Sequence, residues 1–189
     1  LADFDTVLKK DLAKAGNEKR FAKDKKFWDD QLDALGEPLY SDIQGPSVLE
    51  EARKRHGNPK LRSSDIEMKD LFVAVKDYYL EPGPTKNLID FCMNHQLSMT
   101  NLLLLGIRTY LSKVNNGQED ITIQNFISRR STHDEWTSGG SRTIMFPCRT
   151  VITPETDFLS AAYEIQNMQN RIYMHSNYDP AFIMDEMRK

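Results

Sequence analysis

The feature that most constrains the fold is a stretch of two predicted strands joined by a polar loop, at residues 120–153. Residues 120–128 (Asp-Ile-Thr-Ile-Gln-Asn-Phe-Ile-Ser) are rich in β-branched and aromatic residues without a helical period, so they predict a strand. Its odd-numbered residues from Ile121 onward lie on one face and its even-numbered residues on the other. Residues 143–153 return to strand character, and Pro147 predicts an edge or a bulge because it cannot donate a ladder hydrogen bond.

The connection between these strands, residues 129–142, is almost wholly polar. Its Ser-Gly-Gly-Ser segment at residues 138–141 permits backbone angles that are closed to other residues. This segment either cradles a phosphate with backbone N–H groups or forms a flexible turn, which is favoured because no helix start follows directly. The connection as a whole is a functional loop on a rigid scaffold or a mobile hairpin tip, and these residues alone favour the tip.

Charged residues in the loop leave further alternatives open. Arg129 and Arg130 either grip an anionic group with bidentate hydrogen bonds or pair with acidic residues of the same loop. The acidic residues available there are Asp134 and Glu135. His133 has a side chain suited to general-base chemistry at neutral pH, but no partner for it can be identified in the sequence, so it is a weak candidate.

Composition and motifs exclude several classes of protein. Of the 189 residues, 39% are hydrophobic and 28% charged, which is typical of one globular domain or one lobe of something larger. A net charge of -3 and a pI near 5.8 argue against nucleic-acid binding. No apolar run approaches the ~18 residues of a membrane span. We expect no secretory signal. The sequence contains no nucleotide or zinc-protease motif. Cys92 and Cys148 lack metal-site spacing, so we expect two reduced thiols in a cytoplasmic protein.

The N-terminal third is predicted to be helical, with an irregular connection after it. In residues 1–35 the apolar residues that share one stripe are Phe21, Trp28, Leu32 and Leu35. Lysines there are interleaved with acidic residues, which indicates a docking face for an acidic partner or, the favoured alternative, a solvated helix face with i,i+4 pairs. Residues 36–62 are punctuated by Gly and Pro and predict a surface connection with one short helix at 46–56.

The middle of the chain predicts a strand followed by two helices. Residues 70–80 form the best early strand, and a helix follows from Pro84 to about Gln96. Ser98 is a strong N-cap candidate for the next helix, at residues 99–115, with Gly117 just past its end. Its Leu-Leu-Leu-Leu run is apolar all round, which places this helix in the core.

Helices at residues 154–175 and from 181 onward complete the chain. The element order predicts the α/β class, with a mixed β-sheet covered by helices rather than a regular βαβ alternation. Because the chain begins with Leu1 rather than Met, we expect a piece of a larger protein, with a processed terminus as the alternative.

Several blocks of the sequence, in their order and spacing, resemble the pattern of one known family. Residues 21–29 resemble its DxxFW stretch, and residues 97–104 resemble its gvTlnxllLaA helix. Residues 120–130 are similar to its ddvxxgxxxxgR strand and turn, and residues 140–149 to its GxFvNtlPlR strand. A weaker match sets residues 175–180 against HqdxPfe. By these blocks the chain resembles the condensation domain of nonribosomal peptide synthetases, specifically its second half.

Departures from the family pattern bear on the chemistry. Arg142 stands where the family usually has Phe, and Ile144 where it has Asn. The HHxxxDG motif is missing; in the family its second His is thought to position or deprotonate the attacking amine. The resemblance therefore implies no catalytic residue in this chain. We also expect no metal site, because the four histidines are scattered along the sequence.

The resemblance implies the C-terminal lobe of a V-shaped, chloramphenicol-acetyltransferase-like domain. Residues 1–62 are then a lead-in from the first lobe and residues 63–189 an α/β core. The lobe forms one wall of a tunnel where amide bonds join substrates tethered to carrier proteins, and the residues expected to shape that wall or anchor its loop are Arg129, Arg130, Gly140 and Arg149. Phosphopantetheine belongs to the peptidyl or acyl carrier proteins. Expected partners are these carriers, the missing N-terminal lobe and a second copy of the chain, without nucleic acid or membrane.

Two other hypotheses compete with this one. A self-contained acyltransferase of related fold would use His133 or His175 as its base in an oligomeric interface. A plain interaction module would use the basic amphipathic segment at residues 1–35.

Overall fold

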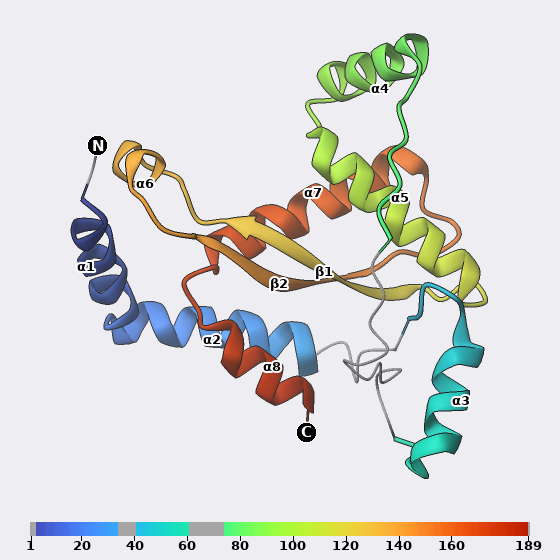
Figure 1. Ribbon diagram of the computed structural model, residues 1–189, viewed down its shortest axis with the longest axis horizontal. Coiled ribbons are helices and arrows are strands. Elements are labelled where there is room, and N and C mark those ends of the chain that lie inside the picture. The colour runs from blue at the N-terminus through green and yellow to red at the C-terminus, as the bar shows by residue number, and fades with distance from the viewer. Residues whose placement is uncertain (1–2, 34–40, 61–73, 189) are drawn as a thin grey trace. The chain divides into compact units, whose positions relative to one another are not determined.

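A computed structural model describes residues 3–33, 41–60 and 74–188 of the chain (Figure 1). The helices and strands are, in order, α1 (Phe4–Ala15), α2 (Glu18–Asp33), α3 (Pro46–His56), α4 (Pro82–Asn94), α5 (Met99–Val114), β1 (Asp120–Ser128), α6 (His133–Thr137), β2 (Thr143–Val151), α7 (Phe158–Met174) and α8 (Pro180–Arg188). The predicted α/β class is confirmed. The chain divides into two compact units, a first unit of residues 1–38, 122–149 and 167–189 and a second unit of residues 39–121 and 150–166.

The sheet of the described residues is the antiparallel pair β1–β2. Arg129 donates its backbone N–H to Arg142 O at 3.0 Å, and Ile152 donates to Glu119 O at 3.1 Å, so both ends share one register. β1 has the predicted bounds, with odd-numbered residues buried and even-numbered residues from Gln124 exposed. Both strands of a two-stranded sheet are edge strands, so Pro147 of β2 lies on an edge, as predicted.

In the first unit, aromatic stacking packs α2 against the inner face of the sheet. Trp28 is 2% exposed; its ring lies 5.2 Å from that of Phe146 and nearly parallel to it, and its Nε1–H donates to His175 O at 3.2 Å. The predicted N-terminal helix is two helices, because Asn17 caps a new start by accepting from Arg20 N at 3.0 Å. Phe21 is still 39% exposed, although it packs against α8, and Leu35 lies outside the described residues.

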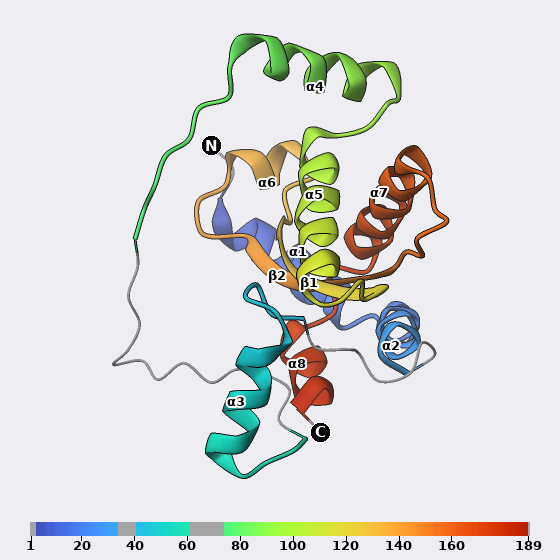
Figure 2. The same ribbon diagram turned by 90° about the vertical axis from the view of Figure 1, so that its right-hand side faces the viewer.

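In the second unit, α5 is organised as its sequence predicts, with one exception. Ser98 is the N-cap and accepts from Asn101 N at 3.1 Å. Three of the four consecutive leucines are buried, but Leu103 is 55% exposed, so the helix is not covered all round. Asn116 and Gly117 have φ angles of 61° and 77°, which ends the helix in left-handed backbone. Figure 2 shows α4 lying across the N-terminal end of this helix.

The predicted strand at residues 70–80 is wrong for the residues of it that the structure describes. Residues 74–80 have no regular secondary structure and are exposed throughout, and residues 70–73 lie outside the described residues. Val75 and Tyr79 are 83% and 92% exposed. A run of apolar residues indicates a need for burial, but a strand also needs a neighbour to bond with, which the pattern does not specify.

The remaining helices lie within a few residues of their predicted bounds. α3 has the predicted bounds and begins after Gly45, whose φ of 94° suits glycine. α4 begins at Pro82, two residues earlier than predicted. α7 begins at Phe158 rather than near residue 154, because Asp157 caps it by accepting from the amides of residues 159 and 160 at 3.0 Å.

Candidate functional site

The polar loop between β1 and β2 contains a one-turn helix, α6, closed by a capping box. Thr132 Oγ1 accepts from Glu135 N at 3.3 Å, and Glu135 Oε2 accepts from Thr132 N at 2.9 Å. The same Oε2 accepts from Ser131 N at 2.7 Å. The Thr-x-x-Glu spacing at residues 132–135 carries this signal, which the sequence-based prediction of a hairpin tip overlooked.

Arg130 holds the rest of the loop together from inside. Its Nη1 donates to the carbonyl of Glu135 and, at 3.1 Å, to that of Ser138, while Nη2 donates to Gly140 O at 2.7 Å. The alternative in which this guanidinium pairs with the acidic side chains of the loop is wrong, because its partners in the described residues are backbone carbonyls and the Ser138 hydroxyl. Such a network fixes the path of an otherwise irregular segment.

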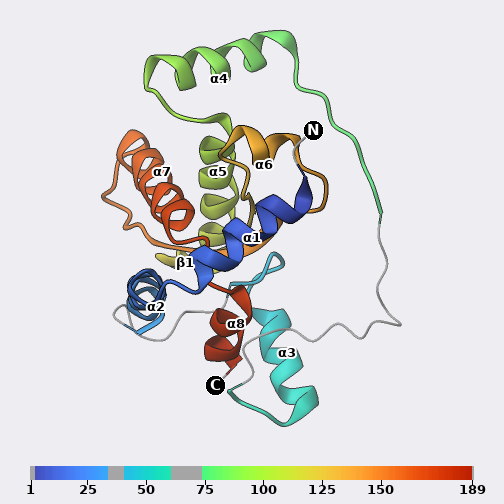
Figure 3. The same cartoon turned by 90° about the vertical axis from the view of Figure 1, so that its left-hand side faces the viewer.

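Ion pairs connect the loop to α1, and we call them the ionic cluster. Asp11 accepts from Arg142 Nη1 at 2.7 Å and lies 3.7 Å from Arg129 Nη2. Arg142 Nη2 also lies 3.5 Å from Glu135 Oε1. Two lysines of α1 complete the cluster, with Lys10 paired to Asp134 at 2.7 Å and Lys14 to Glu135 at 3.6 Å. Figure 3 shows α1 beside α6, and no pattern in the sequence indicates this contact between distant segments.

Glu135 is the most perturbed acid of the loop. Burial by itself would raise its pKa, but hydrogen bonds from Ser131 and Thr132, with the charge of Lys14, lower the pKa from 4.5 to about 2. The carboxylate is therefore ionised at neutral pH. The hydrogen bond to Asp11 likewise raises the pKa of Arg142 above its usual value.

Gly140 and Arg149, two of the residues singled out from sequence, have different surroundings. Gly140 has a φ of 81°, and a Cβ built on it would lie 2.6 Å from the Phe4 ring, so the close approach of α1 requires glycine. Arg149 is buried on β2, where it donates to Gln31 O at 2.9 Å and Leu32 O at 3.4 Å near the end of α2. The loop thus brings Gly140 together with Arg129 and Arg130, whereas these contacts of Arg149 are with α2.

The candidate histidines occupy unlike positions. His175 is 9% exposed, its Nδ1 lies 2.8 Å from Asp24 Oδ1, and its ring stacks on Phe27 with centroids 4.3 Å apart. His133 is exposed at the first position of α6. A further histidine, His95, packs against the ring of Phe91 with centroids 4.6 Å apart.

Buried polar contacts below the sheet are structural in kind. Asn125 Nδ2 donates to Gln169 Oε1 at 2.6 Å, and Gln169 Nε2 donates to Cys148 Sγ at 3.3 Å. Burial raises the pKa of Cys148 to about 11, and both cysteines are free thiols, as predicted. Across the described residues, no three His, Cys, Asp or Glu side chains are placed to hold a metal ion. No described helix has both the length and the apolar character that a bilayer crossing requires.

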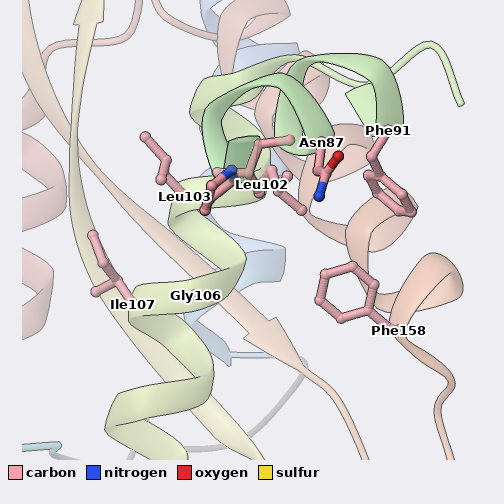
Figure 4. A pocket seen from close by; sticks show the side chains of 9 residues that line it. Asn87, Phe91, Leu102, Leu103, Gly106, Ile107 and Phe158 are labelled. Atoms are coloured by element: carbon pink, nitrogen blue, oxygen red, sulfur yellow. The ribbon is translucent and has the colours of Figure 1, made fainter. Parts of the chain in front are cut away.

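The second unit carries an open apolar groove between α4, α5 and the start of α7 (Figure 4). Its volume is about 840 Å³, and Leu88, Leu102 and Ile107 are among its lining residues. The rings of Phe91 and Phe158 approach each other there, with centroids 5.8 Å apart. This groove offers apolar contact rather than acid–base chemistry.

With the loop and its contacts described, comparison with known proteins decides the family. The model of the family described as Condensation domain matches residues 8–189. This chain belongs to the condensation-domain family. A plipastatin synthase of Bacillus subtilis (strain 168) is 22% identical over 170 residues, which are 89% of this chain and 6% of that protein. The resemblance drawn from sequence blocks is confirmed at this level.

Solved condensation domains share the fold. The first condensation domain of the calcium-dependent antibiotic synthetase, in complex with substrate analogue 2a, matches with a TM-score of 0.75 at 15% identity, over 99% of this chain and 38% of that one. A second structure, of the first condensation domain of the CDA synthetase, matches with a TM-score of 0.74 at 16% identity, over 99% and 37%. The chain therefore has the fold of part of a condensation domain, which is chloramphenicol-acetyltransferase-like.

Proposed function

We propose that this chain is the C-terminal lobe of a nonribosomal peptide synthetase condensation domain. The observation that carries the proposal is the extent of the match: the family covers residues 8–189, yet the chain spans only 37–38% of solved condensation domains. The choice of the C-terminal lobe rests on the sequence blocks, which resemble the second half of the family pattern. The lobe forms one wall of the tunnel in which amide bonds join carrier-tethered aminoacyl and peptidyl groups. Residues 1–62 lead in from the other lobe, and residues 63–189 are the α/β core.

In this proposal the chain supplies framework rather than acid–base chemistry. Its sequence contains no HHxxxDG motif, so the group that handles the amine proton belongs to the other lobe. Arg130 and Gly140 shape the loop of the tunnel wall, and Arg129 anchors one end of it. Arg149 anchors β2 to α2. The contacts of each residue support an anchoring role, since their partners are backbone carbonyls, an acid of α1 or a packed ring.

The expected partners follow from the same chemistry. Peptidyl or acyl carrier proteins bring both substrates on phosphopantetheine arms, so the cofactor is theirs and none is held by this chain. The N-terminal lobe completes the tunnel, and a second copy of the chain is a further partner when that lobe is absent. We place the reaction in the cytoplasm.

An amide-transfer assay tests the proposal. Two carrier proteins, each bearing an aminoacyl group on phosphopantetheine, are mixed with the 189-residue chain or with the complete domain. Mass spectrometry of the acceptor carrier should find dipeptide only with the complete domain. Turnover by the chain alone would refute it.

The acyltransferase alternative depends on a histidine base, and His175 is its better candidate. The Asp24–His175 contact at 2.8 Å resembles the orientation of a general base by a carboxylate. Its burial and its stacking on Phe27 favour a packing role. In an assay with acyl-CoA, unchanged turnover of His133→Ala and His175→Ala variants would remove this alternative.

The interaction-module alternative requires free lysines on the N-terminal helices. Lys25 pairs with Asp29 at 2.7 Å, and Lys26 with Asp30 at 2.9 Å, both at i,i+4. These contacts support the solvated helix face. In an NMR titration with a carrier protein, shifts near the β1–β2 loop favour the condensation lobe, whereas shifts confined to α1 and α2 favour the module.

A further inference from the structure

One carboxylate of α1 contacts both ends of the loop. Arg129 directly follows β1 and Arg142 directly precedes β2. Asp11 Oδ2 accepts from Arg142 Nη1 at 2.7 Å, and Asp11 Oδ1 accepts from Arg142 Nη2 at 3.3 Å across 131 residues of sequence. The same Oδ1 lies 3.7 Å from Arg129 Nη2. A single side chain thus joins the two points where the loop leaves and re-enters the sheet.

The internal hydrogen bonds of the loop do not attach it to α1. The capping box and the guanidinium of Arg130 bond groups that all lie between residues 129 and 142, so they fix the shape of the loop but not its orientation. The ionic cluster supplies the attachment to α1, together with the packing of Phe4 on Gly140.

Within the ionic cluster, Asp11 is better shielded from water than the lysine pairs. The side chains of Asp11 and Arg142 are 18% and 6% exposed, whereas those of Lys10 and Lys14 are 57% and 38% exposed. Exposed ion pairs contribute little and are screened by salt, while breaking a shielded pair leaves an uncompensated charge. Asp11 is therefore the residue on which the orientation of the loop should depend most.

We propose that Asp11 is a positioning residue: through Arg129 and Arg142 it sets the orientation of α6 and of the loop around it. The effect on condensation rests on the proposed function, because orientation matters to catalysis only if this loop lines the tunnel. The attachment runs through Arg142, one of the positions at which this sequence departs from the family pattern that it resembles. α1 then helps to position the tunnel wall, although its sequence alone predicts a solvated helix.

Hydrogen exchange of the loop amides tests the attachment directly on the 189-residue chain. Asp11→Asn removes the charge and keeps the shape of the side chain. A loop released from α1 opens its short internal hydrogen bonds more often, so exchange at residues 131–141 should accelerate by about tenfold or more. Asp11→Glu keeps the charge and should stay within about threefold of the original chain. The matched control is Asp5→Asn, which removes the same charge from the first turn of the same helix and should leave loop exchange unchanged.

Amides of α7 show whether the Asp11→Asn chain remains folded, because their exchange should not change. If this variant does not fold, Arg129→Gln provides the second measurement, since it removes one of the two arginines through which Asp11 acts and should accelerate loop exchange by about threefold. Loop exchange that stays at the original rate in a folded Asp11→Asn chain, or in the Arg129→Gln chain when the first does not fold, would overturn the attachment.

The amide-transfer assay on the complete domain tests the positioning role. Asp11→Asn should lower kcat/KM by about tenfold or more through a displaced tunnel wall, and Asp11→Glu should restore most of it. If the unaltered complete domain forms no amide, the proposed function fails, and the exchange data still decide whether Asp11 holds the loop. Accelerated loop exchange with unchanged kcat and KM in an active domain would overturn the positioning role alone.

Discussion

The composition of the loop at residues 129–142 predicts little order, and that of the segment at residues 74–80 predicts a strand. The structure shows the opposite in both places. The loop is polar and contains two glycines, yet hydrogen bonds and ion pairs fix it from α6 to its ends. The segment is the most strand-like early stretch of the sequence, yet its described residues have no regular structure and are exposed. Tyr79, within it, is 92% exposed, whereas Glu135 in the loop is 5% exposed.

The difference shows that order depends on where the bonding partners of a segment lie. A capping box needs partners only three residues apart, so part of the order of the loop is local, and the ionic cluster adds an attachment to α1 that limits its opening. A strand needs a neighbouring backbone as well as an apolar pattern, and no sequence pattern within the segment supplies one. In the proposed lobe, the rest of the domain is the natural source of that neighbour.

The largest effect should come from breaking the ionic cluster at Arg142. Arg142→Ala removes the guanidinium that Asp11 and Glu135 share and leaves them only the longer pairs with Arg129 and Lys14, so the free energy of unfolding should fall by about 3–5 kcal/mol. Urea unfolding followed by circular dichroism measures this. The control is Lys26→Ala, whose exposed i,i+4 pair should contribute less than about 1 kcal/mol. Equal losses in the two variants would mean that the loop is held by something other than these pairs.

Acid should loosen the loop through Glu135 next. Because its pKa in the folded chain is about 2, below the ordinary 4.5, its stabilisation is complete above about pH 4.5 and is lost as the pH falls toward 2. Glu135→Gln removes this titration and should cost about 3 kcal/mol at pH 7. The stability gap between the two chains should then shrink by about 2 kcal/mol between pH 7 and pH 3. A gap that is the same at both pH values contradicts the low pKa.

Local rules predicted much of the fold, and they did so where partners are close in sequence. The bounds of β1 and α3 and the N-cap role of Ser98 all follow from patterns spanning fewer than a dozen residues. The Thr-x-x-Glu spacing of the capping box is an equally clear local pattern. The glycines that follow it favoured the prediction of a flexible turn instead.

The site depended on contacts that no local rule describes. Asp11 and Arg142 are 131 residues apart, and any of the many acids of the N-terminal region would have matched an arginine equally well on charge alone. Arg149 was selected by resemblance, but its bonds to the last carbonyls of α2 depend on how that helix packs against the sheet. Packing selects one partner among chemically equivalent ones, which is why the loop could be found from sequence but its attachment could not.

The smallest effect is expected for a substitution in the segment at residues 74–80, which tests whether this segment is without burial in the 189-residue chain. Tyr79→Ser removes a ring that is 92% exposed, so the free energy of unfolding of the 189-residue chain should change by less than about 0.5 kcal/mol. Tyr178→Ser is the matched control, because the same ring is 7% exposed there and packs on Phe21, and it should cost about 3 kcal/mol. In the complete domain, Tyr79→Ser should become destabilising if the other lobe covers the segment. A fall of more than about 1 kcal/mol in the free energy of unfolding of the 189-residue chain would contradict this prediction. It would mean that the ring of Tyr79 is buried without the other lobe.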